Sequence, residues 1–307
     1  MTTPTAIVFA YADVGARCLE VLLSGGVDVR AVVTHPDDPV EARWFADVGA
    51  LADGYGLRCL RPVGVDTDVV AELAPLGQVD FVFSFYFRQM LPPGLLALGR
   101  RGALNLHGSL LPKYRGRAPV NWAILRGERE TGATLHYMVQ RADAGDIVDQ
   151  QSVPILINDT AMDVSRKVTV AAEIVLTRSL PKLIDGSAPR VPQAIVPGQY
   201  FGRRRPEDGR IDWSQPARAI HDLVRAVAPP FPGAFSDIDG ERWWIHATRL
   251  AGEAAVTGTL PLLHARNGRC YVACKDGQSL EIRAMATARG PVDLRDLAVS
   301  LPPIRLG

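Results

Sequence analysis

Short apolar runs alternate with amphipathic segments along the first two thirds of the chain. Residues 5–11, "TAIVFAY", are almost wholly apolar, which is typical of a strand buried on both faces of a sheet. Residues 14–24 carry apolar positions at helical spacing and stop at Gly25-Gly26, and we expect Asp13 to cap this helix. The same alternation then predicts further strands at 28–35, 57–60, 79–87 and 103–108, with helices at 41–56 and 66–74. Strands that alternate with helices indicate an α/β domain with an open, mostly parallel, Rossmann-like sheet.

The pattern changes after about residue 205, which indicates a second domain. Residues 203–210, "RRRPEDGR", are polar and resemble a linker, and residues 217–227 predict one amphipathic helix. The apolar positions that share one side of this helix are Ile220, Leu223, Val224 and Val227. Hairpin-type dipeptides then separate short alternating strands at Asp239-Gly240, Asn267-Gly268 and Asp276-Gly277. We therefore expect a catalytic or binding domain at 1–203, followed at 204–307 by a small antiparallel β-barrel (OB-like) domain.

The usual phosphate-binding motifs of parallel α/β folds are absent from the sequence. The first strand is followed by "AYADVGARC", which is not a G-x-G-x-x-G turn, and no G-x-x-x-x-G-K-[ST] run occurs. A ligand must therefore bind elsewhere along the carboxyl ends of the strands.

Composition and charge narrow the class of protein. The 307 residues are 47% hydrophobic and 22% charged with a formal net charge of +1, which is ordinary for a globular protein and gives no electrostatic case for nucleic acid or a membrane surface. We interpret the four cysteines, Cys18, Cys59, Cys270 and Cys274, as reduced core thiols. No His/Cys/Asp cluster has metal-ligand spacing, and neither a secretory leader nor a membrane-length apolar run is present. A cytoplasmic location without a metal is the expectation.

Asn105 and His107 are the first candidate site residues, since positions i and i+2 of a strand share one face. An amide donor beside an imidazole suits a reaction that builds negative charge on an oxygen and moves a proton. An isolated N-x-H pair more often only satisfies neighbouring backbone groups. Here, however, a polar loop follows at 108–119, and Asp143 ends a neighbouring strand, where it could orient His107 and favour the cationic imidazole.

The paired segments "NLHGSLLPKYRGRAP" (105–119) and "DAGDI" (143–147) resemble the folate-dependent formyltransferase family. These enzymes carry a formyl group from N10 of tetrahydrofolate to an amine. Other segments, among them "THPDDP", "FSFYFR" and "FGRRRPEDGRIDW", resemble the UDP-4-amino-4-deoxy-L-arabinose formyltransferase (sugar N-formyltransferase) type, a half of a bifunctional enzyme of bacterial lipid A modification. Its other half, a decarboxylating dehydrogenase, has no counterpart in these residues.

The resemblance implies a role for each matching residue. Asn105 would donate a hydrogen bond to the oxyanion, His107 would be the general acid or proton relay, and Asp143 would hold His107 as a cation. The folate co-substrate, 10-formyltetrahydrofolate, would be bound by Gln89, Met90 and Leu91 through main-chain groups, and by Arg117, Val139, Gln140, Arg141 and Ala142. The resemblance also implies a homodimer.

Four further features of the sequence have a structural or a functional interpretation. We interpret Phe83, Phe85 and Phe87 as core residues, His35 as a loop residue or an acceptor contact, and His136 as structural. The run "FGRRR" (201–205) could bind a diphosphate or anchor the linker.

The acceptor is the least determined part of the prediction. Methionyl-tRNA formyltransferases share the signature, but tRNA needs many Lys and Arg contacts and residues 34–44, "THPDDPVEARW", are acidic. We therefore expect a nucleotide-linked amino sugar, UDP-4-amino-4-deoxy-L-arabinose or a related UDP or dTDP sugar. A small secondary-metabolite amine such as a hydroxyornithine is an alternative, and a folate-binding regulator without activity is disfavoured by the intact Asn105, His107 and Asp143.

Overall fold

The computed structural model describes residues 3–36, 43–198, 200–238, 240–253, 261–300 and 302–306. The chain divides into two compact units, and both are discontinuous in sequence. The first comprises Met1–Pro119, Thr131–Val153 and Arg166–Phe201, and the second comprises Val120–Glu130, Pro154–Ser165 and Gly202–Gly307. Two short segments, Val120–Glu130 and Pro154–Ser165, therefore pack with the C-terminal residues. The functional boundary at 203/204 stays a prediction.

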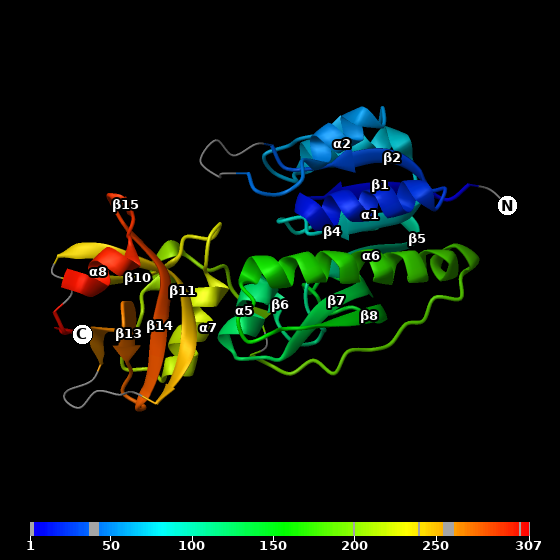
Figure 1. Ribbon diagram of the computed structural model, residues 1–307. Helices are drawn as coiled ribbons and strands as arrows, with labels where there is room; N and C mark the ends of the chain where they lie inside the picture. The colour runs from blue at the N-terminus through cyan, green and yellow to red at the C-terminus, as the bar shows by residue number, and fades with distance from the viewer. Residues whose placement is uncertain are drawn as a thin grey trace. The chain divides into compact units, whose positions relative to one another are not determined.

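The first unit is built on one sheet (Figure 1). Its elements, some of which extend a few residues beyond the unit, are β1 (Thr5–Ala10), α1 (Ala12–Ser24), β2 (Asp28–Val33), α2 (Val48–Gly54), β3 (Cys59–Leu60), α3 (Thr67–Leu73), the 3-10 turn η1 (Ala74–Leu76), β4 (Val79–Phe85), α4 (Pro93–Leu96), β5 (Gly99–His107), β6 (Arg115–Gly116), β7 (Glu130–Tyr137), β8 (Ile147–Pro154), α6 (Ala161–Asp185) and β9 (Tyr200–Phe201).

The order of the sheet is β3-β2-β1-β4-β5-β7-β8, and β3, β2, β1, β4 and β5 are parallel. Strand β7 pairs with β5 in the antiparallel direction. The predicted open, mostly parallel α/β sheet is confirmed. Because β4 and β5 are parallel neighbours, the loop after β4 and the last residues of β5 lie at the same edge of the sheet.

Core packing explains why the apolar runs form strands. Residues Ala6–Ala10 of β1 are fully buried, as are Phe83 and Phe85 of β4. On one face of the sheet α1 and α6 lie side by side, joined by two hydrogen bonds from Arg17 to Glu173 (Figure 1). The fully apolar strands predicted a sheet covered on both faces, and the buried β1 and β4 agree with that prediction.

Two local predictions were wrong. The helix expected at 41–56 is only α2, because Asp47 has extended backbone and its side chain accepts a hydrogen bond from the Ala50 N–H, which starts the helix there. Residues 41–42 lie outside the described residues. Asp13 does not cap α1: the helix begins at Ala12, and Asp13 lies in its first turn, where it accepts from the Ala46 N–H.

The second unit combines an antiparallel sheet with the amphipathic helix predicted at 217–227. Its elements are α5 (Pro119–Leu125), the 3-10 turn η2 (Pro206–Gly209), α7 (Ala217–Ala226), β10 (Ala234–Ile238), β11 (Glu241–Glu253), β12 (Leu262–Arg266), β13 (Arg269–Ala273), β14 (Gln278–Thr287), β15 (Gly290–Pro291), α8 (Leu294–Ser300) and β16 (Ile304–Arg305).

The strand order is β10-β11-β14-β13-β12-β16, and neighbouring strands in this order are antiparallel. Figure 1 shows this sheet curled as part of a barrel, which confirms the predicted barrel-like domain. The turns at Asn267-Gly268 and Asp276-Gly277 join β12 to β13 and β13 to β14. Asp239 lies outside the described residues. Ile220 and Val224 of α7 share a core with Cys270 and Cys274.

Candidate active site

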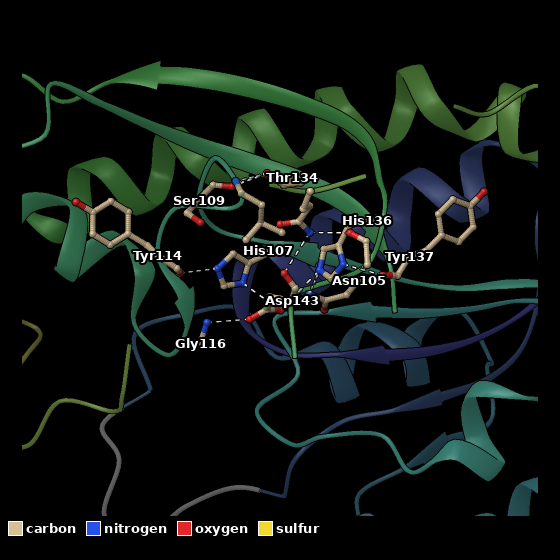
Figure 2. A network of polar contacts seen from close by, with 12 residues as sticks. Asn105, His107, Ser109, Tyr114, Gly116, Thr134, His136, Tyr137 and Asp143 are labelled. Carbon is tan, nitrogen blue, oxygen red and sulfur yellow. Dashed lines mark hydrogen bonds and ion pairs between the residues drawn. The ribbon is translucent and has the colours of Figure 1, made fainter. Parts of the chain in front are cut away.

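Asn105 and His107 lie at the carboxyl end of β5 and point to the same side, as the strand periodicity predicted. Figure 2 shows these two side chains together with His136 and Asp143. The antiparallel pairing of β5 with β7 puts Asn105 opposite His136 and His107 opposite Thr134. Two strands far apart in sequence thus supply the amide and both imidazoles.

Asp143 follows β7 and brings its carboxylate between the two histidines. Its Oδ1 is 3.6 Å from Nδ1 of His107 and 3.6 Å from Nε2 of His136. Its Oδ2 accepts a hydrogen bond of 2.8 Å from the Gly116 N–H (Figure 2). The spatial prediction that Asn105, His107 and Asp143 converge is therefore met by the geometry.

The charge state of Asp143 follows from its surroundings. Burial alone would raise the pKa of this carboxyl, but the charge of the neighbouring His107 and the hydrogen bond from the Gly116 N–H hold the pKa well below its usual range. Asp143 is therefore an anion at neutral pH, and it can stabilise a cationic imidazole.

Both ring nitrogens of His107 face hydrogen-bond acceptors. Nε2 lies 2.9 Å from the carbonyl oxygen of Tyr114, and because a carbonyl only accepts, Nε2 carries a proton. Nδ1 faces the Asp143 carboxylate. The arrangement suits a doubly protonated ring, in which Nδ1 is the atom with a proton to give, since Nε2 is held by the main chain.

His136 belongs to the same network, although the sequence indicated only a structural role. Its Nδ1 lies 2.9 Å from the Tyr137 carbonyl oxygen and so carries the proton, which leaves Nε2 to accept from Asn105 Nδ2 at 3.0 Å. The other contact of Asn105 Nδ2, to Asp143 Oδ1, is 3.5 Å long and therefore weak. One N–H of Asn105 is thus fixed by His136 and the other can turn to a ligand. The pairing of β5 with β7 would have indicated this role, because it places His136 directly opposite Asn105.

The residues expected to bind folate fall into two groups. In the first group, the exposed Arg117 directly follows Gly116, whose N–H donates to Asp143. Val139, Gln140 and Arg141 are exposed and Ala142 is half-buried, in the turn that leads into Asp143. These residues therefore adjoin the catalytic candidates.

Gln89, Met90 and Leu91 follow β4 at the same edge of the sheet. Among the described residues, no hydrogen bond or ion pair joins them to Asn105, His107 or Asp143. The Gln89 amide accepts from Val65 N–H and donates to the Val63 carbonyl, both at 2.8 Å. Met90 is 60% exposed, whereas Leu91 is 7% exposed and packs in the core. Recognition at Gln89 and Leu91 would therefore use main-chain groups.

His35 connects the end of β2 to the loop after β4. Its Nε2 accepts a 3.0 Å hydrogen bond from the Arg88 N–H, and its ring stacks on Phe87 with centroids 4.2 Å apart. His35 therefore positions the loop that carries Gln89 to Leu91, and its contact with an acceptor stays a prediction. In the run 201–205, Arg204 donates to the Asp208 carbonyl and lies over the Trp122 ring, which supports the anchoring interpretation.

The four cysteines are free thiols, and Cys18, Cys270 and Cys274 are buried as predicted, whereas Cys59 is only half-buried. Burial raises the pKa of Cys274 to about 12, so this thiol is unreactive. In the part of the chain that the structure describes, no group of three or more His, Cys, Asp or Glu side chains is arranged so that it could hold a metal ion. No helix among these residues is long and apolar enough to cross a membrane.

An amide donor, an imidazole held by an ionised carboxylate, and their position at the strand ends define a group-transfer enzyme that acts on a carbonyl carbon. Comparison with known families makes this specific. The family model described as formyl transferase matches residues 6–180, and the model described as formyl transferase, C-terminal domain, matches residues 204–300. The chain belongs to the formyl transferase family, which confirms the resemblance of the motif segments and the expected enzyme class.

Solved structures share the fold at low sequence identity. An N-formyltransferase from Helicobacter canadensis, in complex with folinic acid and dTDP-3-aminofucose, is 21% identical with a TM-score of 0.72, and the match covers 92% of this chain and 99% of that one. WlaRD, a sugar 3N-formyl transferase crystallised with dTDP and 5-N-formyl-THF, is 20% identical with a TM-score of 0.67, over 92% and 98% of the two chains. HypX from Aquifex aeolicus, in complex with tetrahydrofolic acid, is 20% identical with a TM-score of 0.63, over 92% of this chain and 44% of that one.

Proposed function

We propose that this protein transfers the formyl group of 10-formyltetrahydrofolate to the amine of a nucleotide-linked amino sugar. The observation that carries the proposal is the Asp143 carboxylate set between His107 and His136, with Asn105 beside them. Family membership supports formyl transfer. The ligands of similar structures, a folate together with dTDP or a dTDP amino sugar, support the donor and the acceptor class.

In the proposed reaction, a neutral acceptor amine attacks the formyl carbon and a new C–N bond forms. Asn105 Nδ2 donates to the formyl oxygen as negative charge grows there. His107 Nδ1 gives a proton to N10 as the old C–N bond breaks and its electron pair moves to that nitrogen. The proton lost by the amine restores His107, so the reaction leaves the enzyme unchanged. Asp143 stabilises the cationic imidazole before the proton is given and after it is restored.

The main-chain groups of residues 89–91 and the exposed side chains near Asp143 suit the binding of a formyl-folate. We assign the pterin to the main chain of Gln89, Met90 and Leu91, because the Gln89 amide is engaged with Val63 and Val65 and the Leu91 side chain is in the core. Arg117 and the turn Val139, Gln140, Arg141 and Ala142 complete the pocket, next to Gly116 and Asp143. The exposed side chains of Met90 and Val139 offer apolar surface for a ring.

We also propose a finer identity for the acceptor. UDP-4-amino-4-deoxy-L-arabinose, and with it a role in lipid A modification, comes from sequence resemblance. The related structures carry dTDP or a dTDP amino sugar, which favours the wider class of UDP- or dTDP-linked amino sugars. A homodimer stays a prediction.

A panel of acceptors tests the function. The protein is incubated with 10-formyltetrahydrofolate and, separately, UDP-4-amino-4-deoxy-L-arabinose, dTDP-3-aminofucose, hydroxyornithine or methionyl-tRNA, and tetrahydrofolate release is followed. UDP-glucose, which has no amine, is the matched control. Release with an amino-sugar nucleotide alone supports the proposal. Release only with hydroxyornithine or tRNA overturns the acceptor class, and release with none favours a folate-binding regulator.

A further inference from the structure

The chain that leaves α6 touches the candidate active site at two places. Residues 190–193 lie against the turn that carries Asp143, and β9 pairs with β6, which carries Gly116. Neither contact involves the reacting groups directly. Both, however, reach main-chain atoms that determine where the Asp143 carboxylate lies.

Gln193 makes the most direct of these contacts. Its Nε2 donates to the carbonyl oxygen of Gly145 at 2.6 Å and to that of Asp143 at 3.2 Å. An amide oxygen in this position would face two other oxygens, so the Gln193 orientation follows from the chemistry of its partners. The Gln193 Oε1 is buried and has no hydrogen-bond partner among the described residues. Gln193 therefore acts on the Asp143 turn through its two Nε2 N–H donors and not through Oε1.

The backbone of the Asp143 turn needs such support. Asp143 has a φ of +51°, in the left-handed region that is unfavourable for a non-glycine residue unless the surroundings hold it. Gly145 packs so tightly that a Cβ there would lie 2.0 Å from the Tyr137 carbonyl oxygen. Val191 exchanges two main-chain hydrogen bonds with Ile147, and Arg190 lies over the Tyr137 ring at 3.7 Å. The segment 190–193 thus fixes both ends of the turn.

The second contact acts on the other oxygen of the same carboxylate. Gly116, whose N–H donates to Asp143 Oδ2, pairs with Phe201 of β9, and the next N–H, that of Arg117, donates to the Phe201 carbonyl at 2.9 Å. On the other side of Arg115, the carbonyl of Tyr114 accepts from His107. Strand β9 therefore braces the two main-chain groups that hold His107 and Asp143.

We propose that Gln193 is a positioning residue for formyl transfer: its amide locks the Asp143 turn so that the carboxylate faces Nδ1 of His107. Gln193 acts through Asp143 and does not touch substrate. The inference rests on the proposed function for its kinetic readout.

The test compares Gln193→Met with Gln151→Met. Met keeps the length of the side chain and removes both N–H donors. Gln151 is a matched control, because its amide donates to the Ser152 carbonyl, outside the site. We expect Q193M to lower kcat about 10- to 100-fold, as small displacements of catalytic groups do, with the KM for 10-formyltetrahydrofolate unchanged and the protein still folded at the assay temperature. A kcat equal to that of Q151M, or a higher KM at unchanged kcat, overturns the proposal.

Two further measurements keep the test decisive. If Q193M does not fold, Gln193→Glu replaces it in the test. Glu keeps the shape of the side chain but sets an oxygen against the two carbonyls, so this variant must lose kcat by at least the factor of about 10 to 100 expected for Q193M. Ring ¹⁵N resonances of His107, assigned with His107→Gln, need no acceptor and must shift in the Gln193 variant and not in Q151M. If the wild type uses no acceptor, the proposed function fails, and unshifted His107 resonances would separately reject the positioning role.

Discussion

Asp143 is the residue on which the site depends, since it contacts both imidazoles and a main-chain donor at once. Its lowered pKa keeps it ionised, and His107 then has a negative partner on one ring nitrogen and a carbonyl on the other. Asn105 is oriented from the opposite side by His136. Each of the three proposed catalytic side chains is therefore held by a neighbour before any ligand binds.

Removal of either reacting side chain tests these roles. We expect Asn105→Ala and His107→Ala each to reduce formyl transfer about 10²- to 10³-fold, because each deletes a donor to charge that develops in the transition state. Single-turnover release of tetrahydrofolate measures the rate, and melting temperatures show whether each variant is folded. A folded variant with a rate near that of the wild type would remove that residue from the mechanism.

The pH dependence of stability tests the environment of Asp143. Because its folded pKa lies below the unfolded value of about 3.9, the ionised carboxylate stabilises the folded state above that pH, and the stabilisation is lost as the pH falls through the lowered pKa. Asp143→Asn should therefore be less stable than the wild type at pH values above about 4, and the difference should shrink in stronger acid. Urea unfolding over this range measures it. A difference that grows on acidification would contradict the assignment.

At the scale of elements, α7 holds the second unit together through buried polar contacts. Arg225 pairs with Asp222 at 2.8 Å and donates to the Asp159 carbonyl, while Asn121 donates to the Ala226 carbonyl at 2.7 Å. His221 lies 2.8 Å from the Ile157 carbonyl oxygen. The helix therefore connects the two earlier segments of this unit, Val120–Glu130 and Pro154–Ser165, to its C-terminal sheet.

The buried pair in α7 gives a stability prediction. Asp222 and Arg225 are both nearly inaccessible, so Asp222→Ala leaves a buried cation without its partner and should lower the free energy of unfolding by about 3–5 kcal/mol. Asp237→Ala, which breaks the exposed pairs with Arg210 and Arg242, is the control and should change much less. Urea denaturation followed by tryptophan fluorescence compares them. Equal losses in both variants would show that burial of the pair is unimportant.

For the whole molecule, the sequence predicted most of the fold and part of the site. Buried strands such as 5–11 and the helix at 217–227 were predictable because their apolar spacing reflects local geometry. The start of α2 was not, since it depends on the Asp47 cap. The convergence of Asn105, His107 and Asp143 was predicted from strand ends and resemblance. His136 and Gln193 were missed, because their roles arise from strand register and from a segment fifty residues downstream of Asp143.

The discontinuous second unit has a consequence for synthesis on the ribosome. Residues 120–130 and 154–165 emerge early, but their partners, among them Arg225 and the carbonyl of Ala226, follow only after many more residues are translated. The Ile155 N–H donates to the Arg129 carbonyl and so joins the two segments to each other, but their contacts with the C-terminal part can form only after that part has left the exit tunnel. A nascent chain arrested before residue 217 should therefore be more exposed to proteases and chaperones at these two segments than the completed polypeptide.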